Sequence, residues 1–190
     1  TFLGLALVVA AMPGSITFPA SSLADVGAAL ANGPTMLAVL YTSTIMVAIY
    51  QVFTFFGPVI EANVGKSPEL VMLLLGLYGG GAVLGNAIGG FLTDRIGSVR
   101  TLALLAVAQA GLLTAFALTP ISPPLFAVLV VLWSLFGWSF MAPQQARLVA
   151  LAPQATSLVL GLNAAAIYLG ISIGSPIASL VLANFGLAGL

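Results

Sequence analysis

The stretch that decides the fold runs from residue 81 to residue 100 and reads GAVLGNAIGGFLTDRIGSVR. Gly81, Gly85 and Gly89 recur at every fourth position, so they share one face of a helix where the backbone of another helix can approach closely. The apolar run closes with a short charged segment around Asp94, after which the sequence becomes apolar again. This pattern predicts two consecutive membrane-spanning helices joined by a short connection.

The composition of the whole chain supports a membrane protein. Of its 190 residues, 61% are hydrophobic and only 4% are charged, and the mean hydropathy is +1.23. So few charges cannot cover a soluble domain, which excludes a soluble globule, a disordered chain and a nucleic-acid binder. The sequence contains neither Cys nor His, so no disulfide, thiol nucleophile or Cys/His metal site is expected, and no cofactor. The apolar runs lack the alternation of barrel strands, so the predicted fold class is an all-α integral membrane protein.

Five apolar stretches are long enough to cross a bilayer, since a crossing helix needs about 20 residues. The spans are predicted at Thr35–Ile60, Leu70–Leu92, Thr101–Leu118, Leu125–Ala142 and Ser157–Val181. The connections, which are rich in Pro, Gly, Ser or charge, are predicted at Glu61–Glu69, Thr93–Arg100, Thr119–Pro124 and Pro143–Thr156.

The N-terminal part of the chain does not form a complete span. Thr1–Met12 is apolar but too short to cross alone, so we interpret it as the end of a truncated span. A short interfacial helix is expected within Pro13–Pro34, because Ser22 and Asp25 have the spacing of a capping box. We therefore expect the chain to be a fragment of a larger protein.

The basic residues predict the orientation of the spans. Arg95, Arg100 and Arg147 fall in connections on one side, whereas Lys66 falls on the other. Because short cytoplasmic loops carry the excess of Lys and Arg, the three arginines are predicted to lie in the cytoplasm.

Asp94 is a candidate functional residue. It lies at a helix C-terminus, where the helix dipole disfavours an anion, so it is expected to have a partner. That partner is either a nearby Arg or the N-terminus of a neighbouring helix, and a contact released when helices move would act as a conformational latch. The alternative is a hydrated loop carboxylate with no such role.

Residues 90–97, GFLTDRIG, resemble the loop signature of the major facilitator superfamily, G-x-L-x-D-R-x-G followed by basic residues. Three further stretches are similar to that family: residues 53–58, residues 143–153 and residues 162–170. The resemblance implies the C-terminal half, from the end of span six to span eleven, of a twelve-span drug:proton or arabinose-efflux-like antiporter. It implies a switch motif whose residues here are Gly90, Asp94, Arg95, Gly97 and Arg100. Ser98 and Val99 depart from the family pattern, which has basic residues there.

Under that resemblance the chain is one half-bundle of a secondary active transporter, a proton-coupled exporter of a drug, sugar or other metabolite. Residues 13–34 become the cytoplasmic linker between the halves. The implied partners are the lipid bilayer of the cell (inner) membrane, the missing N-terminal half, a small-molecule substrate and protons. No Asp, Glu, Lys or Arg lies inside a predicted span, so the proton-coupling residue is expected in the missing half.

Polar and aromatic side chains on the spans are candidates for a substrate cavity, which needs aromatic walls and a few hydrogen-bonding groups. At 100° per residue, two helical stripes of about 80° and 60° carry most of them. The candidates are Tyr41, Thr44, Gln51 and Phe55 on the first stripe, Trp133 and Gln144 on the second, with Asn86 and Asn163 on two other spans. The alternative is that these groups bond to their own helix backbones or lie at the membrane interface.

Gly170, Gly174 and Pro176 in the last span predict close helix packing and a bend, as the Gly81, Gly85 and Gly89 stripe predicts close packing in the second span. Two other functional classes were weighed. An intramembrane hydrolase is excluded because the chain has no His or Cys, no paired intramembrane Asp and no buried Lys, so no enzyme is predicted. A non-transporting membrane scaffold, with the glycine stripes as assembly faces, remains an alternative.

Overall fold

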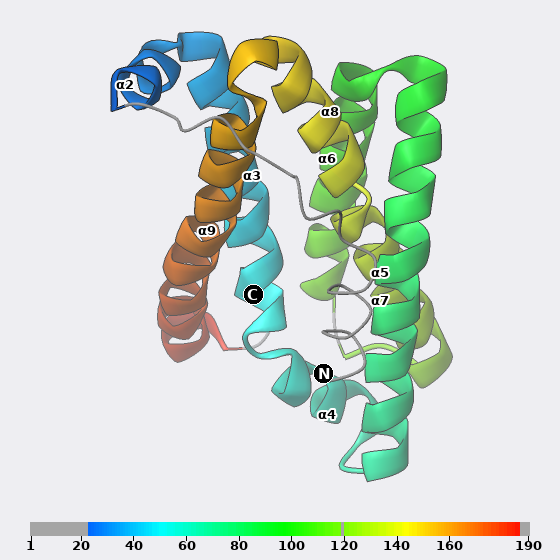
Figure 1. Cartoon of the computed structure of the whole chain (residues 1–190). Coiled ribbons are helices and arrows are strands. Elements are labelled where there is room, and N and C mark those ends of the chain that lie inside the picture. Colours follow the sequence, from blue (N-terminus) through cyan, green and yellow to red (C-terminus); the bar gives the residue numbers. More distant parts are fainter. Residues whose placement is uncertain (1–22, 119, 187–190) are drawn as a thin grey trace, which may run out of the picture.

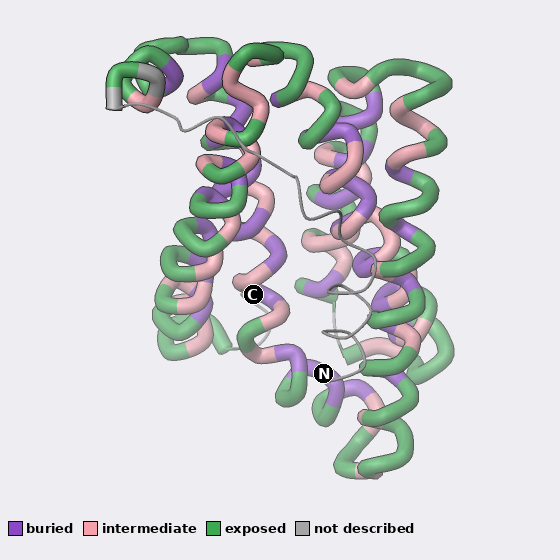
Figure 2. The backbone as a smooth tube through the Cα atoms, in the orientation of Figure 1, coloured by how far each residue is buried: buried purple, intermediate pink, exposed green. Residues whose placement is uncertain are grey.

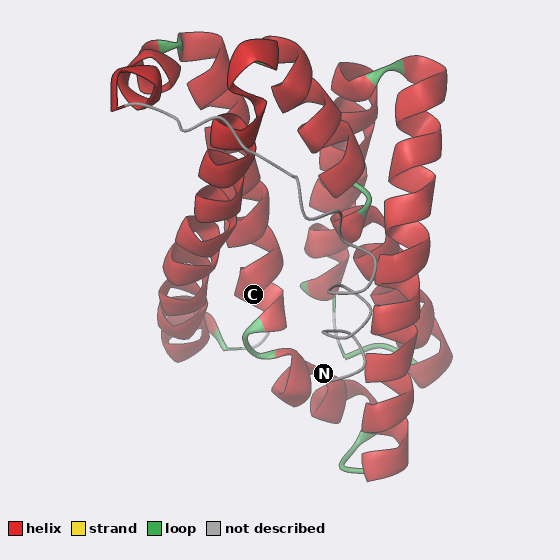
Figure 3. Cartoon of the chain, in the orientation of Figure 1, coloured by secondary structure: helices red, strands yellow, loops and turns green. Residues whose placement is uncertain are grey.

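The computed structural model describes residues 23–118 and 120–186, and every regular element in these ranges is helical (Figure 1, Figure 3). Thr1–Met12 and the first part of Pro13–Pro34, residues 13–22, lie outside the described residues. In chain order the elements are α2 (Leu23–Ala31), α3 (Gly33–Phe53), α4 (Phe56–Val64), α5 (Pro68–Ile96), α6 (Ser98–Phe116), α7 (Pro123–Trp138), α8 (Met141–Leu151), the short 3₁₀ turn η1 (Pro153–Ala155) and α9 (Thr156–Phe185). The predicted all-α membrane fold is confirmed.

Polar caps and prolines set the starts of the long helices. Asn32 caps α3 by accepting a hydrogen bond from the Thr35 N–H at 3.1 Å, and Ser67 caps α5 by accepting from the Leu70 N–H at 3.4 Å. Prolines occupy the first turns of α3, α5 and α7, where the missing N–H costs nothing. These local signals explain why the helices begin where they do.

The fourth predicted connection is instead helical. Pro143 suggested a loop, but it lies in the first turn of α8, where proline is tolerated. The chain from Pro123 to Leu151 is therefore one apolar span with a break at Ser139 and Phe140. The break has a physical cause, because Pro143 has no N–H to give to the Ser139 carbonyl one turn earlier. Arg147 consequently lies on a helix and not in a loop, which corrects the prediction.

One other connection is shorter than predicted, and one predicted span is interrupted. Between α5 and α6 only Gly97 is non-helical, and its φ of 84° is a conformation that favours glycine. The first predicted span is broken at Thr54 and Phe55 into α3 and α4, because Pro58 deprives the Thr54 carbonyl of its helical partner. By contrast α9 continues as one helix through Pro176.

The helices pack as two close pairs joined by α6 and α8. α3 packs along α9 and α5 packs along α7, while α6 contacts α7, α5 and α8 (Figure 1). The buried side of each helix faces the interior of the bundle and the exposed side faces outward (Figure 2). The main core contains Met46, Ile49, Phe126 and Trp133, and a smaller one joins α3, α8 and α9 through Ala38, Leu148 and Val159.

Five of these segments are long and apolar enough to cross a membrane. Their outward faces carry large apolar side chains, such as Met72, Val83 and Leu180, each more than 60% exposed. In water such a surface would be strongly unfavourable, but in lipid it is the expected exterior. The α5–α6 corner and the end of α8 lie at one end of the bundle, and α4 lies at the other (Figure 1).

Candidate functional site

The switch motif forms the corner between α5 and α6. Asp94 and Arg95 lie in the last turn of α5, Gly97 makes the turn, and Arg100 lies in the first turn of α6. All of these residues are exposed. The helix dipoles disfavour both Asp94 at a C-terminus and Arg100 at an N-terminus, whereas Arg95 is favourably placed. The corner therefore presents two charges that a partner from outside would stabilise.

No partner for Asp94 is found among residues 23–118 and 120–186. Arg95 instead lies over the Phe91 ring, with its guanidinium carbon 5.0 Å from the ring centroid. The expected contact of Asp94 with an Arg or a helix N-terminus is thus not made within the described part of this chain. Gly90 leaves open space beside it, with no heavy atom within 4 Å of the position its Cβ would take.

Two of the cavity candidates, Gln144 and Asn163, lie in the interior, where both bond to Thr42, a residue that was not among the predicted site residues. Gln144 Nε2 on α8 donates to Thr42 Oγ1 on α3 at 2.9 Å, and Thr42 Oγ1 donates to Asn163 Oδ1 on α9 at 2.5 Å. Gln144 also donates to the Ala38 carbonyl. We call Thr42, Gln144 and Asn163 the polar node; all three are at least 97% buried. It joins three helices and explains why these polar residues lie inside an apolar bundle.

Trp133 lies at the centre of an aromatic cluster. Its ring centroid is 5.1 Å from that of Phe116, 5.2 Å from Tyr78 and 5.4 Å from Phe56. Trp138 donates its indole N–H to the Tyr78 hydroxyl at 2.9 Å. These separations are typical of favourable tilted and edge-on ring pairs, so Trp133 stabilises the core and is not exposed to a cavity.

The remaining candidates lie on outer or half-buried faces. Tyr41 donates to the Leu102 carbonyl of α6 at 3.2 Å, and its hydroxyl lies within electrostatic reach of Arg147. Asn86 and Thr44 are exposed and donate to carbonyls of their own helices, as the alternative interpretation expected. Gln51 and Phe55 are half-buried. The two predicted stripes thus do not face each other across one cavity.

The outer side of α3 nevertheless carries polar side chains among exposed apolar ones. Thr44 and Gln51 lie on the side that also exposes Leu37 and Leu40, and no Asp, Glu, Lys or Arg occurs on α3. At the end of this side Thr54 donates to Ser175 Oγ of α9 at 3.0 Å. We call Thr44, Gln51 and Thr54 the polar face of α3.

Glycines allow the two close helix pairs. A Cβ at Gly81, Gly85 or Gly89 would overlap the Ser134 side chain or the Leu135 and Ser139 carbonyls of α7. A Cβ at Gly170 would lie 2.5 Å from Met46 Cβ. At Gly174 it would lie 2.8 Å from the Val47 carbonyl oxygen. Substitution of these glycines therefore has to displace a backbone or a neighbouring helix.

Gln109 was not among the predicted site residues, because a single polar residue in an apolar span carries no periodic signal. The structure buries it between α6 and α7, with its amide opposite Gly137. Neither Nε2 nor Oε1 has a hydrogen-bond partner within the described residues. Gln109 is therefore the least satisfied polar side chain of the described core.

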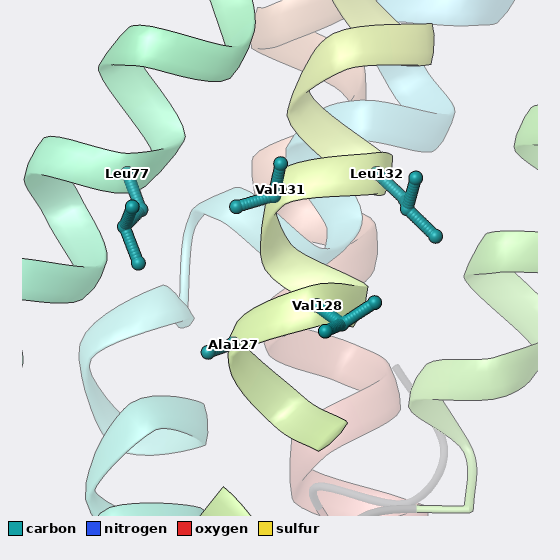
Figure 4. A pocket seen from close by; sticks show the side chains of 5 residues that line it. All are labelled: Leu77, Ala127, Val128, Val131 and Leu132. Carbon is teal, nitrogen blue, oxygen red and sulfur yellow. The ribbon is translucent and has the colours of Figure 1, made fainter. Parts of the chain in front are cut away.

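Two apolar grooves open on the outer surface. One, of about 290 Å³, is lined by Leu77 of α5 and by Ala127, Val128, Val131 and Leu132 of α7 (Figure 4). The other, of about 200 Å³, lies between α6 and α7 and includes Leu118, Leu125 and Leu129. Neither is lined by a polar side chain, so they suit apolar chains and offer no hydrogen bonds to a polar solute.

Comparison with known proteins identifies the family. The sequence profile of the Major Facilitator Superfamily matches residues 3–190. The chain is 25% identical over 140 residues to an uncharacterized MFS-type transporter, YbcL, of Bacillus subtilis (strain 168), which covers 73% of this chain and 35% of that protein. It is 27% identical over 145 residues to the inner membrane transport protein YdhP of Escherichia coli (strain K12), covering 75% and 36%. The chain thus spans about a third of these relatives, and no solved structure matches it. The chain belongs to the Major Facilitator Superfamily of membrane transporters.

Proposed function

We propose that the chain is the C-terminal half-bundle of a secondary active transporter that exports small molecules in exchange for protons. The observation that supports this is the polar face of α3. Thr44 is exposed and Gln51 is half-buried, although both lie on a helix whose length and hydropathy suit a membrane span, and the exposed Thr54 follows directly after that helix. A polar side chain on the outside of a span is unfavourable in hydrocarbon, whereas it suits a hydrated pathway between two half-bundles.

The substrate wall proposed here consists of Thr44, Gln51 and Phe55, and Asn86 on α5 is proposed as a separate solute contact. Thr44 and Gln51 supply hydrogen bonds and Phe55 supplies an aromatic surface. None of them carries a charge, so this half recognises neutral parts of a substrate, and the proton-coupling group belongs to the other half. The cell (inner) membrane is the proposed location, with the α5–α6 corner in the cytoplasm.

In the proposed cycle the two halves rock against each other and the α5–α6 corner latches one state. Asp94 and Arg100 lie at helix ends whose dipoles disfavour their charges. A partner on the second half would relieve this cost in one conformation only. The corner would then bias the equilibrium between the two conformations, as alternating access requires.

The test is transport by the full-length protein in proteoliposomes, with ethidium and L-arabinose as separate probes, with and without an imposed pH gradient. Gradient-driven movement of either probe that falls at least about tenfold in the Gln51→Ala variant supports the proposal, since about 1.4 kcal/mol of lost binding is a factor of ten. Gln145→Ala is the control, because Gln145 is an exposed glutamine on a different helix, α8. Folded, correctly inserted protein that moves neither probe under any gradient would favour the scaffold alternative.

The latch has its own test. We expect Asp94→Asn to lower transport several-fold while the unfolding free energy changes by less than about 0.5 kcal/mol, because the residue is exposed and has no partner in the described part of the chain. Glu61→Gln provides a matched control, as Glu61 is an exposed carboxylate at the opposite end of the bundle. Unchanged transport by Asp94→Asn would remove the latch from the mechanism.

A further inference from the structure

Gln109 carries a buried amide without a hydrogen bond. It lies near the middle of α6 with 3% of its surface exposed. Its Nε2 and Oε1 atoms are both enclosed and have no partner among residues 23–118 and 120–186. Enclosed amide atoms that bond neither to protein nor to water carry the full cost of their desolvation. An apolar side chain would fill the same place without that cost, so the amide is a disadvantage in this conformation.

A glycine of the facing helix provides the room for this amide. A Cβ at Gly137 of α7 would lie 3.3 Å from Gln109 Nε2 and 3.6 Å from Ile49 Cδ1 of α3. Gln109 therefore lies where α6 meets both α7 and α3. Gly137 is in the last turn of α7, before the break at Ser139 and Phe140. Movement of this end of α7 relative to α6 would directly change the surroundings of the amide.

The contact between α6 and α7 lacks the close backbone approach of the two helix pairs. Gly111 of α6 has open space around it, so it brings no neighbouring backbone close. Beside Leu118 the apolar groove of about 200 Å³ separates α6 from α7. Within the described residues, the hydrogen bond that joins α6 to another helix is that from Tyr41 to the Leu102 carbonyl, at 3.2 Å. Apolar and aromatic packing therefore holds α6 against α7, with no hydrogen bond between these two helices in the described part of the chain.

We propose that Gln109 is a positioning residue for the conformational change of transport. In the present conformation α6 is packed against Gly137 and the amide is unbonded. In the opposite conformation α6 moves away from α7, and water reaches the amide. Because a polar group favours the state in which it is hydrogen-bonded, the amide lowers the population of the packed state and favours exchange between the two. This inference rests on the alternating access proposed above.

A single thiol can report when water enters this contact, because the chain contains no cysteine. Leu113→Cys places the thiol one turn after Gln109 on the same side of α6, where Leu113 is half-buried. Val107→Cys, on the opposite side, which is 74% exposed, is the control. Each variant is made in the full-length protein, with any cysteine outside residues 1–190 replaced, and treated in its membrane with a charged, water-soluble methanethiosulfonate from both sides. The labelling rate then measures how often the contact is hydrated, since the reactive thiolate forms in water and not in hydrocarbon.

The substitutions at the contact should change the labelling rate of Leu113→Cys in opposite directions. Gln109→Leu should slow it about tenfold, because the packed state no longer contains a buried, unbonded amide. Gln109→Asn keeps an amide and should be labelled at a rate closer to that of the wild-type background. Gly137→Ala should speed labelling several-fold, since its methyl group would lie 3.3 Å from Gln109 Nε2. Val107→Cys should react slowly in every background.

Two results would overturn the inference. One is an unchanged labelling rate of Leu113→Cys in the Gln109→Leu background, and the other is a Leu113→Cys thiol that is unreactive in every background. Transport of ethidium and L-arabinose by the same proteins separates this failure from that of the proposed function. If either result is found in a protein that transports a probe, the positioning role fails and the transporter stands. If Gln109→Leu slows labelling in a protein that transports neither probe under any gradient, the opening of the contact stands and the proposed exporter fails.

Discussion

The two close helix pairs are built differently although both depend on glycine. α5 meets α7 along three successive glycines, Gly81, Gly85 and Gly89, and the contacts are with a serine side chain and two backbone carbonyls. α3 meets α9 at two glycines, where added Cβ atoms would overlap less severely. Both pairs are therefore close backbone contacts, and the glycines of the first pair lie nearer to the opposing helix than those of the second.

Both pairs also have interhelical hydrogen bonds. Between α5 and α7, Trp138 donates to the Tyr78 hydroxyl at 2.9 Å, and just beyond the end of α7 Ser139 Oγ donates to the Gly85 carbonyl at 2.8 Å. The α3–α9 pair has the Thr42–Asn163 bond of the polar node, the hydrogen bond from Ser43 to the Ala166 carbonyl at 2.9 Å and the Thr54–Ser175 bond. The comparison teaches that both pairs combine glycine contacts with hydrogen bonds, and that the polar node of the second also fixes α8.

The largest expected effect comes from adding a methyl group at the glycine contact between α5 and α7. Gly85→Ala should lower the unfolding free energy by about 3 kcal/mol, because the new methyl group meets the Leu135 carbonyl. Gly170→Ala should lower the unfolding free energy by about 1–2 kcal/mol. Gly80→Ala and Gly161→Ala are controls with open space around them, and should be neutral or stabilising by up to about 1 kcal/mol. The measurement is unfolding in mixed micelles; equal losses at Gly85 and Gly170 would contradict the difference between the two helix pairs.

The next effect comes from the polar node. Gln144→Leu should cost about 1–2 kcal/mol, since it removes two interhelical hydrogen bonds inside the bundle while Thr42 keeps its bond to Asn163. The neighbouring Gln145→Leu should change the same unfolding free energy by less than about 0.5 kcal/mol, because Gln145 is exposed. Identical stabilities for the two variants would show that the node does not hold α8 against α3.

The smallest effect is expected at the other buried glutamine. Gln109→Leu should leave the unfolding free energy within about 0.5 kcal/mol of the wild type or raise it, because neither amide atom has a partner among residues 23–118 and 120–186. The contrast with Gln144→Leu, measured in the same micelles, separates a bonded buried amide from an unbonded one. A loss as large as that of Gln144→Leu would mean that Gln109 is hydrogen-bonded in the membrane.

The sequence was sufficient for the architecture but not for all helix boundaries. Composition and apolar run length predicted a helical membrane protein, and the signature around Asp94 predicted the family, and both are confirmed. Family membership also supports the expectation of a transporter and not an enzyme. The helical connection after Ala142 was missed because Pro143 signals either a loop or a helix start, and only packing of Gln144 and Leu148 against α3 decides between them.

Interior contacts were harder to predict than helices. The glycine spacing indicated that α5 has a close neighbour, but nothing in residues 81–89 says that the neighbour is α7. Thr42, Gln144 and Asn163 are far apart in the sequence, and no spacing rule relates them. Trp133 was assigned to a cavity because aromatic residues line many binding sites, yet the surrounding rings of three other helices make it core.

The length of α5 has a mechanical consequence. Glu69 lies in its first turn and Asp94 in its last, so at about 1.5 Å per residue roughly 37 Å of helix separates the two carboxylates. The hydrocarbon layer is about 30 Å thick, so the segment between the two carboxylates extends only slightly beyond it at each end. The length of α5 is thus matched to one bilayer thickness. A thinner membrane would force α5 to tilt. Because Gly97 alone separates the two helices, α6 would change its tilt together with α5.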